Sequence, residues 1–469
     1  MAKIADPSGL VNLGNTCYLN SVVQCLRAIP NLRHCLAAYP SNRSARIQAG
    51  GASSGPSPLL TTLKDLYLNL DRSTNAVPPA QFVMATKMAF PQFAQTGPQG
   101  QPMQQDAEEF YSSLLTVMAE ELQGSPAIAS AFGNKSLSED ALLGATNAVD
   151  AMFGIKLEET LTCDEITTPA TAAGEDASME DTSTIKRFDL QRKLLCNIQG
   201  GAGQAAAPIM DIKHIVEGLH LSLSGKLEKH SDVLGRNAMW TKTQRIARLP
   251  PILTVQFGRF YWKLTPDSAD HSGVKCKIMK PVTFQSTLDL YEFCSPEVQK
   301  ILKVHRDRAA AAEEKRVQDK LKGDTKKPIG EETKSDLIEE PKGEDDAAME
   351  DVDEEEAAAL KAALELSMQE ETPPQPPVGP GLPDDFQGVY ELFAVVTHKG
   401  RDADGGHYMG WVKSENGAED DWYVFDDDEV SPCKTEDVLK LKGGGDWHMS
   451  YLNFYRAKCP DPKSNSEAK

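Results

Sequence analysis

The order of apolar and polar residues divides the chain into a helical N-terminal part, a strand-rich remainder and a charged stretch that interrupts the strands. From Gly9 to about Leu122, apolar residues recur three and four positions apart, which is the period of an amphipathic helix. The clearest helical runs are Asn20–Leu26, Leu59–Leu70 and Ala107–Met118. We therefore predict that this N-terminal part is mainly helical.

The pattern changes to strands from Phe153 to Phe284 and again from Val389 to Tyr455. Short runs of β-branched and aromatic residues are typical of buried strands. Such runs are Leu219–Leu223, Ile252–Phe257 and Val389–Val396. The polar segment Glu165–Thr184 is rich in Ala and Thr, and we expect it to be a flexible loop between strands. Helices followed by strands indicate the α+β fold class.

The charged stretch runs from His305 to about Pro380 and is nearly free of aromatic residues, so we predict that it is largely disordered. Residues 1–304 and 381–458 then form one globular domain, and residues 305–380 are an acidic insertion. Glu331–Glu371 contains seventeen Asp and Glu residues but three Lys, so it supplies −14 of the net charge of −20. The rest of the chain has an ordinary charge for a soluble enzyme.

Composition narrows the possible partners and compartments. No basic patch stands out, so we expect no nucleic-acid partner, and no apolar run has the length of a membrane span. The nine cysteines are odd in number and widely spaced, and no Cys-x-x-Cys pair occurs. We therefore expect neither a disulfide framework nor a zinc site, and no cofactor. The N-terminus lacks the apolar stretch of a signal peptide, so we expect a cytoplasmic or nuclear protein.

The segment from Gly9 to Gln24 carries the strongest chemical signal. Gly14 permits a tight turn, Asn15 is a candidate N-cap, and the apolar residues that follow predict a helix with Cys17 in its first turn. The dipole of such a helix favours the thiolate, the reactive form of cysteine. The backbone N–H of Cys17 and the amide of Asn12 are candidate donors to an oxyanion. A buried structural cysteine is the alternative, which Cys25 and Cys35 fit better.

A second chemical signal lies near the C-terminus. His407 follows a pair of glycines and opens a predicted strand, and the next strand ends in Asp426, Asp427 and Asp428. Two neighbouring antiparallel strands bring such a histidine beside an aspartate. A neutral imidazole can take the proton of Cys17 while a carboxylate holds the ring. Spacing alone does not separate the three aspartates.

With these residues in view, the sequence resembles the ubiquitin-specific proteases. The segment around Cys17 resembles the cysteine box of that family, and Tyr390–Asp428 resembles its histidine box. Gln104–Phe110 is similar to a third segment, which lines the substrate cleft. Further stretches resemble the proteasome-associated branch; these are Arg236–Trp240, Arg248–Ile252 and Gly443–His448.

The resemblance implies a papain-like cysteine protease with a helical thumb at about residues 9–122 and a β-rich palm and fingers. Cys17 is then the nucleophile, His407 the general base, Asp426 the acid that orients the base, and Asn12 a donor in the oxyanion hole. The implied reaction is hydrolysis of the bond after the C-terminal glycine of ubiquitin. The implied partners are ubiquitin, polyubiquitinated proteins and the proteasome.

Several residues of the three motifs are candidates for contact with ubiquitin, whose basic tail would favour acidic walls. These are Gln105, Asp106, Glu109 and Tyr408. In the suggested branch, loops at Thr265–Gly273 and Gly400–Gly406 lie across the channel for that tail. The second has little packing to hold it and can move without disturbing the strands around it. The alternative is that both are ordinary hairpin turns.

The acidic insertion contains a second candidate site at residues 354–371. Its strong helix formers place four small or apolar residues on one face of a predicted helix. These are Leu360, Ala363, Leu364 and Ser367, in a pattern that resembles a ubiquitin-interacting motif. The alternative is a linker that is helical by composition. For the whole chain, a non-catalytic ubiquitin-binding scaffold is the alternative function, and a protease for a ubiquitin-like modifier is another.

Overall fold

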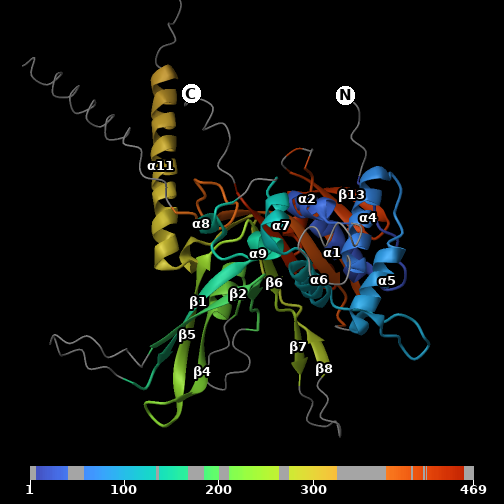
Figure 1. Cartoon of the computed structure of the whole chain (residues 1–469), viewed down its shortest axis with the longest axis horizontal. Coiled ribbons are helices and arrows are strands. Elements are labelled where there is room, and N and C mark those ends of the chain that lie inside the picture. Colours follow the sequence, from blue (N-terminus) through green and yellow to red (C-terminus); the bar gives the residue numbers. More distant parts are fainter. Residues whose placement is uncertain are drawn as a thin grey trace, which may run out of the picture. The chain divides into compact units, whose positions relative to one another are not determined.

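The computed structural model describes residues 7–40, 57–133, 137–166, 184–199, 211–263, 274–324, 376–402, 405–415, 418 and 420–458. The chain divides into two compact units. The first comprises residues 1–302 and 377–469, and the second comprises residues 303–376. The first unit mixes helices and sheets (Figure 1) and contains Cys17, His407 and Asp426.

Helices form most of the N-terminal part of the first unit, as the sequence pattern predicts. They are α1 (Cys17–Arg27), α2 (Pro30–Ala38), α4 (Pro58–Arg72), α5 (Ala80–Ala89), the 3-10 turn η1 (Pro91–Ala94), α6 (Ala107–Glu121), α7 (Gly124–Ala131), α8 (Glu139–Leu142) and α9 (Ala148–Phe153). Three of them contain the runs that were assigned from apolar spacing, so the helical prediction for α1, α4 and α6 is confirmed.

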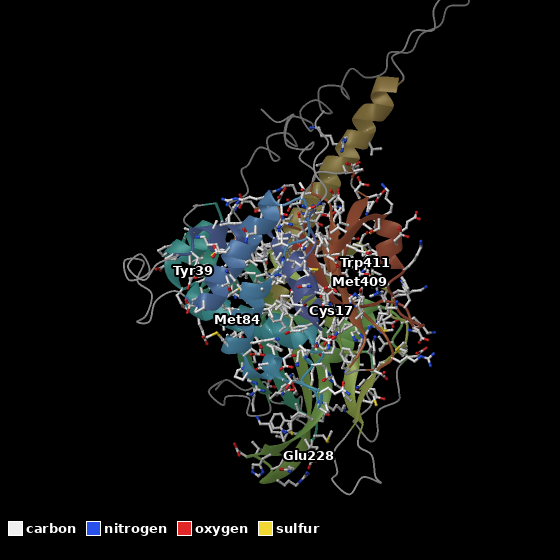
Figure 2. The ribbon with its side chains drawn as sticks, turned by 90° about the vertical axis from the view of Figure 1, so that its right-hand side faces the viewer. Cys17, Tyr39, Met84, Glu228, Met409 and Trp411 are labelled. Carbon is white, nitrogen blue, oxygen red and sulfur yellow. The ribbon has the colours of Figure 1, made fainter. Side chains whose placement is uncertain are left out.

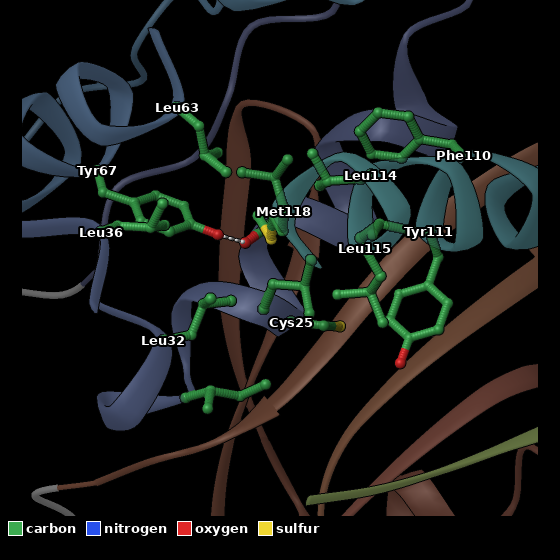
Figure 3. Close-up of a cluster of buried hydrophobic side chains, with 14 of the residues drawn as sticks. Cys25, Leu32, Leu36, Leu63, Tyr67, Phe110, Tyr111, Leu114, Leu115 and Met118 are labelled. Carbon is green, nitrogen blue, oxygen red and sulfur yellow. Dashed lines mark hydrogen bonds between the residues drawn. The ribbon is translucent and has the colours of Figure 1, made fainter. Parts of the chain in front are cut away.

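Helix α1 is the centre of this helical layer, and its residues from Cys17 to Leu26 are all buried. Leucines and aromatic residues of α2, α4 and α6 pack around it (Figure 3). The hydroxyl of Tyr67 donates a hydrogen bond to the carbonyl of Val23 at 3.1 Å, which fixes α4 against α1. Each fully buried Leu or Phe side chain contributes about 1.5–3 kcal/mol to folding, so α1 is held firmly.

Within the described residues, the largest sheet has eight strands. Seven follow the order β13 (Glu429–Lys434), β12 (Asp421–Asp426), β11 (His407–Lys413), β10 (Val389–Lys399), β14 (Met449–Ala457), β6 (Ile252–Phe257) and β3 (Leu194–Cys196). The remaining strand, β9 (Thr287–Asp289), pairs with β10. All pairs are antiparallel except β3 with β6. The strand predictions for residues 252–257 and 389–396 are confirmed.

Both faces of the large sheet are covered at its centre. Along β10, Phe393, Ala394 and Val396 belong to the core that contains the helices, whereas Leu392 and Val395 belong to a second core on the other side. This burial explains why the β10 sequence is a nearly continuous apolar run rather than an alternating one. The helical layer therefore rests on a rigid, doubly buried support.

Two smaller sheets extend from this body. One has the order β2 (Thr184–Gln191), β1 (Ile155–Cys163), β5 (Arg236–Arg248) and β4 (Ser224–Ser231), and the other pairs β7 (Phe260–Lys263) with β8 (Val274–Lys277). In Figure 1, helices α1, α4, α5 and α6 lie on the right, and the four-stranded sheet that contains β1 and β5 (the β1–β5 sheet) extends to the lower left. Both small sheets are antiparallel.

One predicted strand is a helix. Leu219–Leu223 lies in α10 (Ile215–Leu223), which begins with a capping box between His214 and Glu217. Ile215, Leu219 and Leu223 are buried one turn apart, so the apolar run reflects one face of a helix. A segment of five residues with three leucines does not distinguish a helix from a strand without its neighbours.

The predicted disorder of residues 305–380 is wrong at both ends. Helix α11 spans Pro296–Asp324 and passes from the first unit into the second. At the other end, Val378 is buried and its carbonyl accepts from the N–H of Leu249 at 2.9 Å. The rest of the insertion, including residues 354–371 with Leu360, Ala363, Leu364 and Ser367, lies outside the described residues, as do most of Glu165–Thr184 and Thr265–Gly273. Helix α13 (Thr435–Leu439) and the 3-10 turn η2 (Tyr291–Phe293) complete the elements.

Candidate active site

Cys17 is the first residue of α1 and is only 3% exposed. The chain reaches it through a turn in which Gly14 and Asn15 both have positive φ, 93° and 53°. The predicted N-cap was wrong, because Thr16 occupies that position. Asn15 instead donates its side-chain amide to the carbonyl of Pro102 at 2.8 Å. Figure 2 shows Cys17 where the helices meet the C-terminal strands, with Met409 and Trp411 of β11 nearby.

His407 and Asp426 meet at one end of the large sheet. His407 opens β11 and Asp426 closes β12, and these strands pair in antiparallel fashion, so the two residues lie at the same edge. His407 Nε2 is 2.5 Å from Asp426 Oδ1. This hydrogen bond leaves Nδ1 of the ring for Cys17. The structure thus brings together Cys17, His407 and one of the three aspartates from opposite ends of the chain.

The environment of His407 favours its charged form. A hydrogen bond with Cys17 is the largest cause that raises the pKa of His407 to about 9, and the hydrogen bond to Asp426 adds to it against the opposing effect of burial. An imidazolium beside a cysteine stabilises the thiolate. His407 is therefore placed to accept a proton from Cys17.

The neighbouring Asp427 has a different task. The φ of 53° at Asp427 turns the chain, so the side chain of Asp427 points away from Asp426 and toward α1. One carboxylate oxygen accepts from Asn12 Nδ2 and the other from Asn20 Nδ2, both at 2.8 Å. Burial raises the pKa of the Asp427 carboxyl, while these two donors lower it. Asp428 is exposed. The three aspartates therefore differ in their partners: Asp426 bonds to His407, Asp427 bonds to two asparagines, and Asp428 is exposed.

Asn12 is fixed on the loop that leads into α1. Its Oδ1 accepts from the backbone N–H groups of Gly14 at 2.9 Å and Thr16 at 3.2 Å, and its Nδ2 donates to Asp427. An amide nitrogen has two hydrogens, so one N–H of Asn12 is left for a ligand. The first N–H groups of a helix have no partner within the helix, which leaves the backbone N–H of Cys17 available for the same ligand.

Gln104 is a site residue that the sequence reasoning missed. Gln104 lies on the stretch that precedes α6, and its Nε2 is 3.3 Å from Cys17 Sγ. It stands inside the motif Gln104–Phe110, so the motif gave a signal for the segment but none for this side chain. Its amide is a third donor beside the sulfur.

The candidate ubiquitin contacts differ in how free they are. Asp106 caps α6 through the N–H of Glu108 at 2.9 Å, and it also accepts from Tyr451 at 2.7 Å and pairs with Lys275 at 3.5 Å. Its first task is therefore structural. Glu109 is mostly exposed. The part of its side chain that is buried raises the pKa of its carboxyl, and the negative charge of Asp106 raises it further. Gln105 makes a 3.5 Å contact with the carbonyl of Met103.

Tyr408 does not fit the role of a contact residue in this structure. Its side chain is only 2% exposed and packs against His398 and Tyr451, with ring centroids 4.6 and 6.3 Å apart. The prediction failed because successive residues of a strand face opposite sides of the sheet. His407 faces the site, so Tyr408 faces the core.

His407, Asp426 and Asp427 also offer ligand atoms within 4.8 Å of one another, as a metal site does. However, His407 already bonds to Asp426, and both oxygens of Asp427 are used by asparagines. The donor set fits a hydrogen-bonded catalytic group better than a metal. None of the helices in the described ranges is long and apolar enough to cross a membrane.

Comparison with known proteins agrees with this geometry. Residues 8–455 match the protein family described as ubiquitin carboxyl-terminal hydrolase. The chain is 36% identical over 451 residues to ubiquitin carboxyl-terminal hydrolase 6 of Arabidopsis thaliana, covering 96% of this chain and 78% of that protein. Ubiquitin carboxyl-terminal hydrolase 6 of Schizosaccharomyces pombe is 32% identical over 458 residues, with coverages of 96% and 78%.

A more distant relative is ubiquitin carboxyl-terminal hydrolase 14 of Caenorhabditis elegans, at 26% identity over 452 residues, or 96% of this chain and 73% of the relative. These similarities extend from the segment of Cys17 to the last strand of the sheet. The chain therefore belongs to the ubiquitin carboxyl-terminal hydrolase family and is a deubiquitinating cysteine protease.

Proposed function

We propose that Cys17 is the nucleophile of this deubiquitinase, that His407 is its general acid and base, and that Asp426 orients His407. The observation that carries the proposal is the position of one imidazole ring between Cys17 and Asp426. His407 Nδ1 takes the proton of Cys17, and the thiolate attacks the carbonyl carbon of the terminal glycine of ubiquitin. The imidazolium then protonates the leaving amine.

The resulting thioester is hydrolysed by a water molecule whose proton passes to His407, and the thiol is restored when His407 returns that proton. Each half-reaction passes through an oxyanion. We assign its stabilisation to the free N–H of Asn12, the backbone N–H of Cys17 and the amide of Gln104. This assignment rests on the hydrogen bonds that hold Asn12 and on the distance of 3.3 Å between Gln104 and the sulfur.

The proposed roles are tested by a ubiquitin derivative with an electrophile at its C-terminus. We expect it to form a covalent adduct that maps to Cys17. A derivative of a ubiquitin-like modifier is the matched control for specificity. If Cys17 stays unlabelled both alone and with purified proteasome, the chain is better described as a ubiquitin-binding scaffold.

The three aspartates give a prediction with distinct outcomes. Asp426→Asn should lower turnover of a ubiquitin-coumarin substrate by about 100-fold or more, because the ring of His407 loses its orienting acceptor. Asp427→Asn places a donor against Asn12 or Asn20 and should lower the free energy of unfolding by about 1–3 kcal/mol. Asp428→Asn is the exposed control. Turnover lost in Asp427→Asn alone would transfer the orienting role to that residue.

The pH dependence of Asp426→Asn supplies a second readout of the same prediction. The pKa of His407 is raised to about 9, so the imidazolium needed to protonate the leaving amine persists below that pH and is lost as the pH rises through it. Removing the negative charge of Asp426 lowers this pKa. The alkaline limb of the rate profile should therefore move to lower pH in Asp426→Asn and stay in place in Asp428→Asn.

We also propose that the described elements correspond to a papain-like arrangement. The helical layer from α1 to α6 is the thumb, the eight-stranded sheet is the palm, and the β1–β5 sheet forms the fingers. The assignment is supported by the site, since the nucleophile begins a helix and the base begins a strand of the sheet. Among the described residues, all eight cysteines are free, which agrees with the proposed cytoplasmic or nuclear location.

Ubiquitin, polyubiquitinated proteins and the proteasome are the proposed partners. The last rests on the stretches Arg236–Trp240, Arg248–Ile252 and Gly443–His448, which resemble the proteasome-associated branch. Addition of purified proteasome should then raise the rate of probe labelling. An unchanged rate would remove the proteasome from the list of partners.

For the insertion we propose that residues 354–371 bind ubiquitin through the stripe of Leu360, Ala363, Leu364 and Ser367. Ala363→Arg should then weaken capture of polyubiquitin chains without changing turnover of a ubiquitin-coumarin substrate. Ala362→Arg adds the same charge on the opposite face of the predicted helix and is the matched control. Equal capture by both variants and the parent would make the segment a linker.

A further inference from the structure

A buried lysine lies behind the turn that leads into His407. Lys277 is the last residue of β8, and its Nζ reaches across to the end of β10. It donates to His398 Nδ1 at 2.6 Å, to the carbonyl of His398 at 3.1 Å and to the carbonyl of Gly400 at 2.7 Å. An ammonium group has three protons, and here all three have an acceptor.

The bonds of Lys277 fix the state of His398. The charged ammonium group offers no acceptor, so His398 Nδ1 accepts from it, and the ring proton is on Nε2, which donates to the carbonyl of Gly405 at 2.8 Å. Burial lowers the pKa of His398 to about 3, with the charge of Lys277 adding to the effect. The ring is thus a neutral bridge from Lys277 to Gly405.

The glycines of the turn are packed against the same ring. A Cβ added to Gly406 would lie 2.8 Å from His398 Nε2 and 2.1 Å from the carbonyl of Lys399, and Gly406 has a φ of 95°. The described residues of the turn are therefore held in place, in contrast to the little packing that the sequence suggested. Arg401 adds an ion pair with Asp446 at 2.5 Å. His407 directly follows Gly406 along the chain.

We propose that Lys277 is a positioning residue for the hydrolysis: it fastens the turn before His407 through His398 and Gly400, and so keeps the base in line with Cys17. The proposal rests on the assignment of His407 as the base. Lys277 touches neither Cys17 nor His407 by any hydrogen bond in the described structure. It acts on the site through the backbone that carries the base.

The role of Lys277 depends on the protonation of its amine. Burial lowers the pKa of Lys277 to about 7, and the charge of Arg259 adds to the effect. Arg259 is itself fully buried and donates to four backbone carbonyls, so it is a fixed charge. A neutral amine has two protons, so loss of the charge would leave one of the three acceptors without a donor.

The experiment measures the rate at which iodoacetamide alkylates Cys17 in the full chain, as a function of pH, by mass spectrometry of the Cys17 peptide. This reagent reacts with thiolate, whose amount depends on the alignment of His407. Lys277→Met keeps the length of the side chain but removes its donors. We expect alkylation at neutral pH to fall about tenfold and the acid limb of the profile to move to higher pH.

Two further variants make the result specific. Lys277→Gln keeps donors and should lie between Lys277→Met and the parent. Lys280→Met is the matched control. Lys280 lies on the segment that follows β8 and pairs with Asp211 at 2.5 Å, so this variant should leave the profile unchanged. A lysine that only stabilised the fold would lower the reactive fraction without changing the shape of the profile. Superimposable profiles for Lys277→Met, Lys277→Gln and the parent would overturn the proposal.

His407→Ala separates this proposal from the one on which it rests. If His407→Ala and the parent react equally fast at neutral pH, then His407 does not support the thiolate and the assignment of the base fails. If His407→Ala reacts slowly while Lys277→Met matches the parent, only the role of Lys277 fails. Kinetics with ubiquitin-coumarin should agree, with kcat reduced in Lys277→Met and KM little changed.

Discussion

Replacing Cys17 with alanine should lower ubiquitin hydrolysis by at least about 10⁴-fold while leaving ubiquitin binding nearly intact. The nucleophile forms the covalent bond to the substrate, yet its sulfur is a small part of the surface that ubiquitin would cover. Cys17 is 3% exposed and begins a rigid helix, so replacing it with the smaller alanine should not disturb the fold. Turnover of ubiquitin-coumarin and binding by calorimetry measure the two effects.

Cys25→Ala is the matched control, since Cys25 lies two turns further along the same helix. It is fully buried, its Sγ contacts the carbonyl of Val395 at 3.7 Å, and burial raises the pKa of its thiol far above the usual range. A thiol in that state is inert. Cys25→Ala should keep probe labelling, and labelling that depended on Cys25 would contradict the assignment of Cys17.

Replacing His407 with alanine should lower kcat by about 10³- to 10⁴-fold. The variant loses both the acceptor for the thiol proton and the imidazolium that supports the thiolate. The rate should also lose the alkaline limb that belongs to a group with a pKa of about 9. Stopped-time hydrolysis of ubiquitin-coumarin across a pH series measures both quantities.

His448→Ala provides the comparison for this variant, because its ring lies 6.2 Å from that of His407. Burial lowers the pKa of His448 to about 3, and its Nδ1 lies 3.1 Å from Thr397 Oγ1, so it is neutral and engaged in the core. It should affect stability more than the shape of the pH profile. A profile that lost its alkaline limb in His448→Ala but kept it in His407→Ala would exchange their roles.

The sequence alone was enough to identify the chemical centre because its signals are local. Gly14 marks the turn before Cys17, and the glycines before His407 mark the start of a strand. Strand pairing then accounts for the meeting of His407 with an aspartate. Which aspartate it is depends on the residue where β12 ends and on the positive φ of Asp427, and neither is visible in a run of three identical residues.

Other features depend on contacts between distant segments and could not be predicted. Gln104 reaches Cys17 across 87 positions, and Lys277 reaches His398 across 121. Lys277 stands in the strand sequence Val-Lys-Cys-Lys, which suggests a solvated charge rather than a buried one. Likewise residues 219–223 alone predict a strand, because the helical periodicity of α10 is apparent only when Ile215 and the cap at His214 are included.

The place of β14 in the sheet has a consequence for how this enzyme is made. This strand spans Met449–Ala457, yet it lies between β10 and β6 near the middle of the sheet. A ribosome adds about 5–20 residues per second, so the apolar faces of β6 and α6 emerge many seconds before the strand that joins them to β10. Until then Tyr111 and Phe393 lack their neighbour Phe454. During synthesis the nascent chain should therefore depend on chaperones, and any product that stops short of β14 should be a target for degradation rather than a partly active protease.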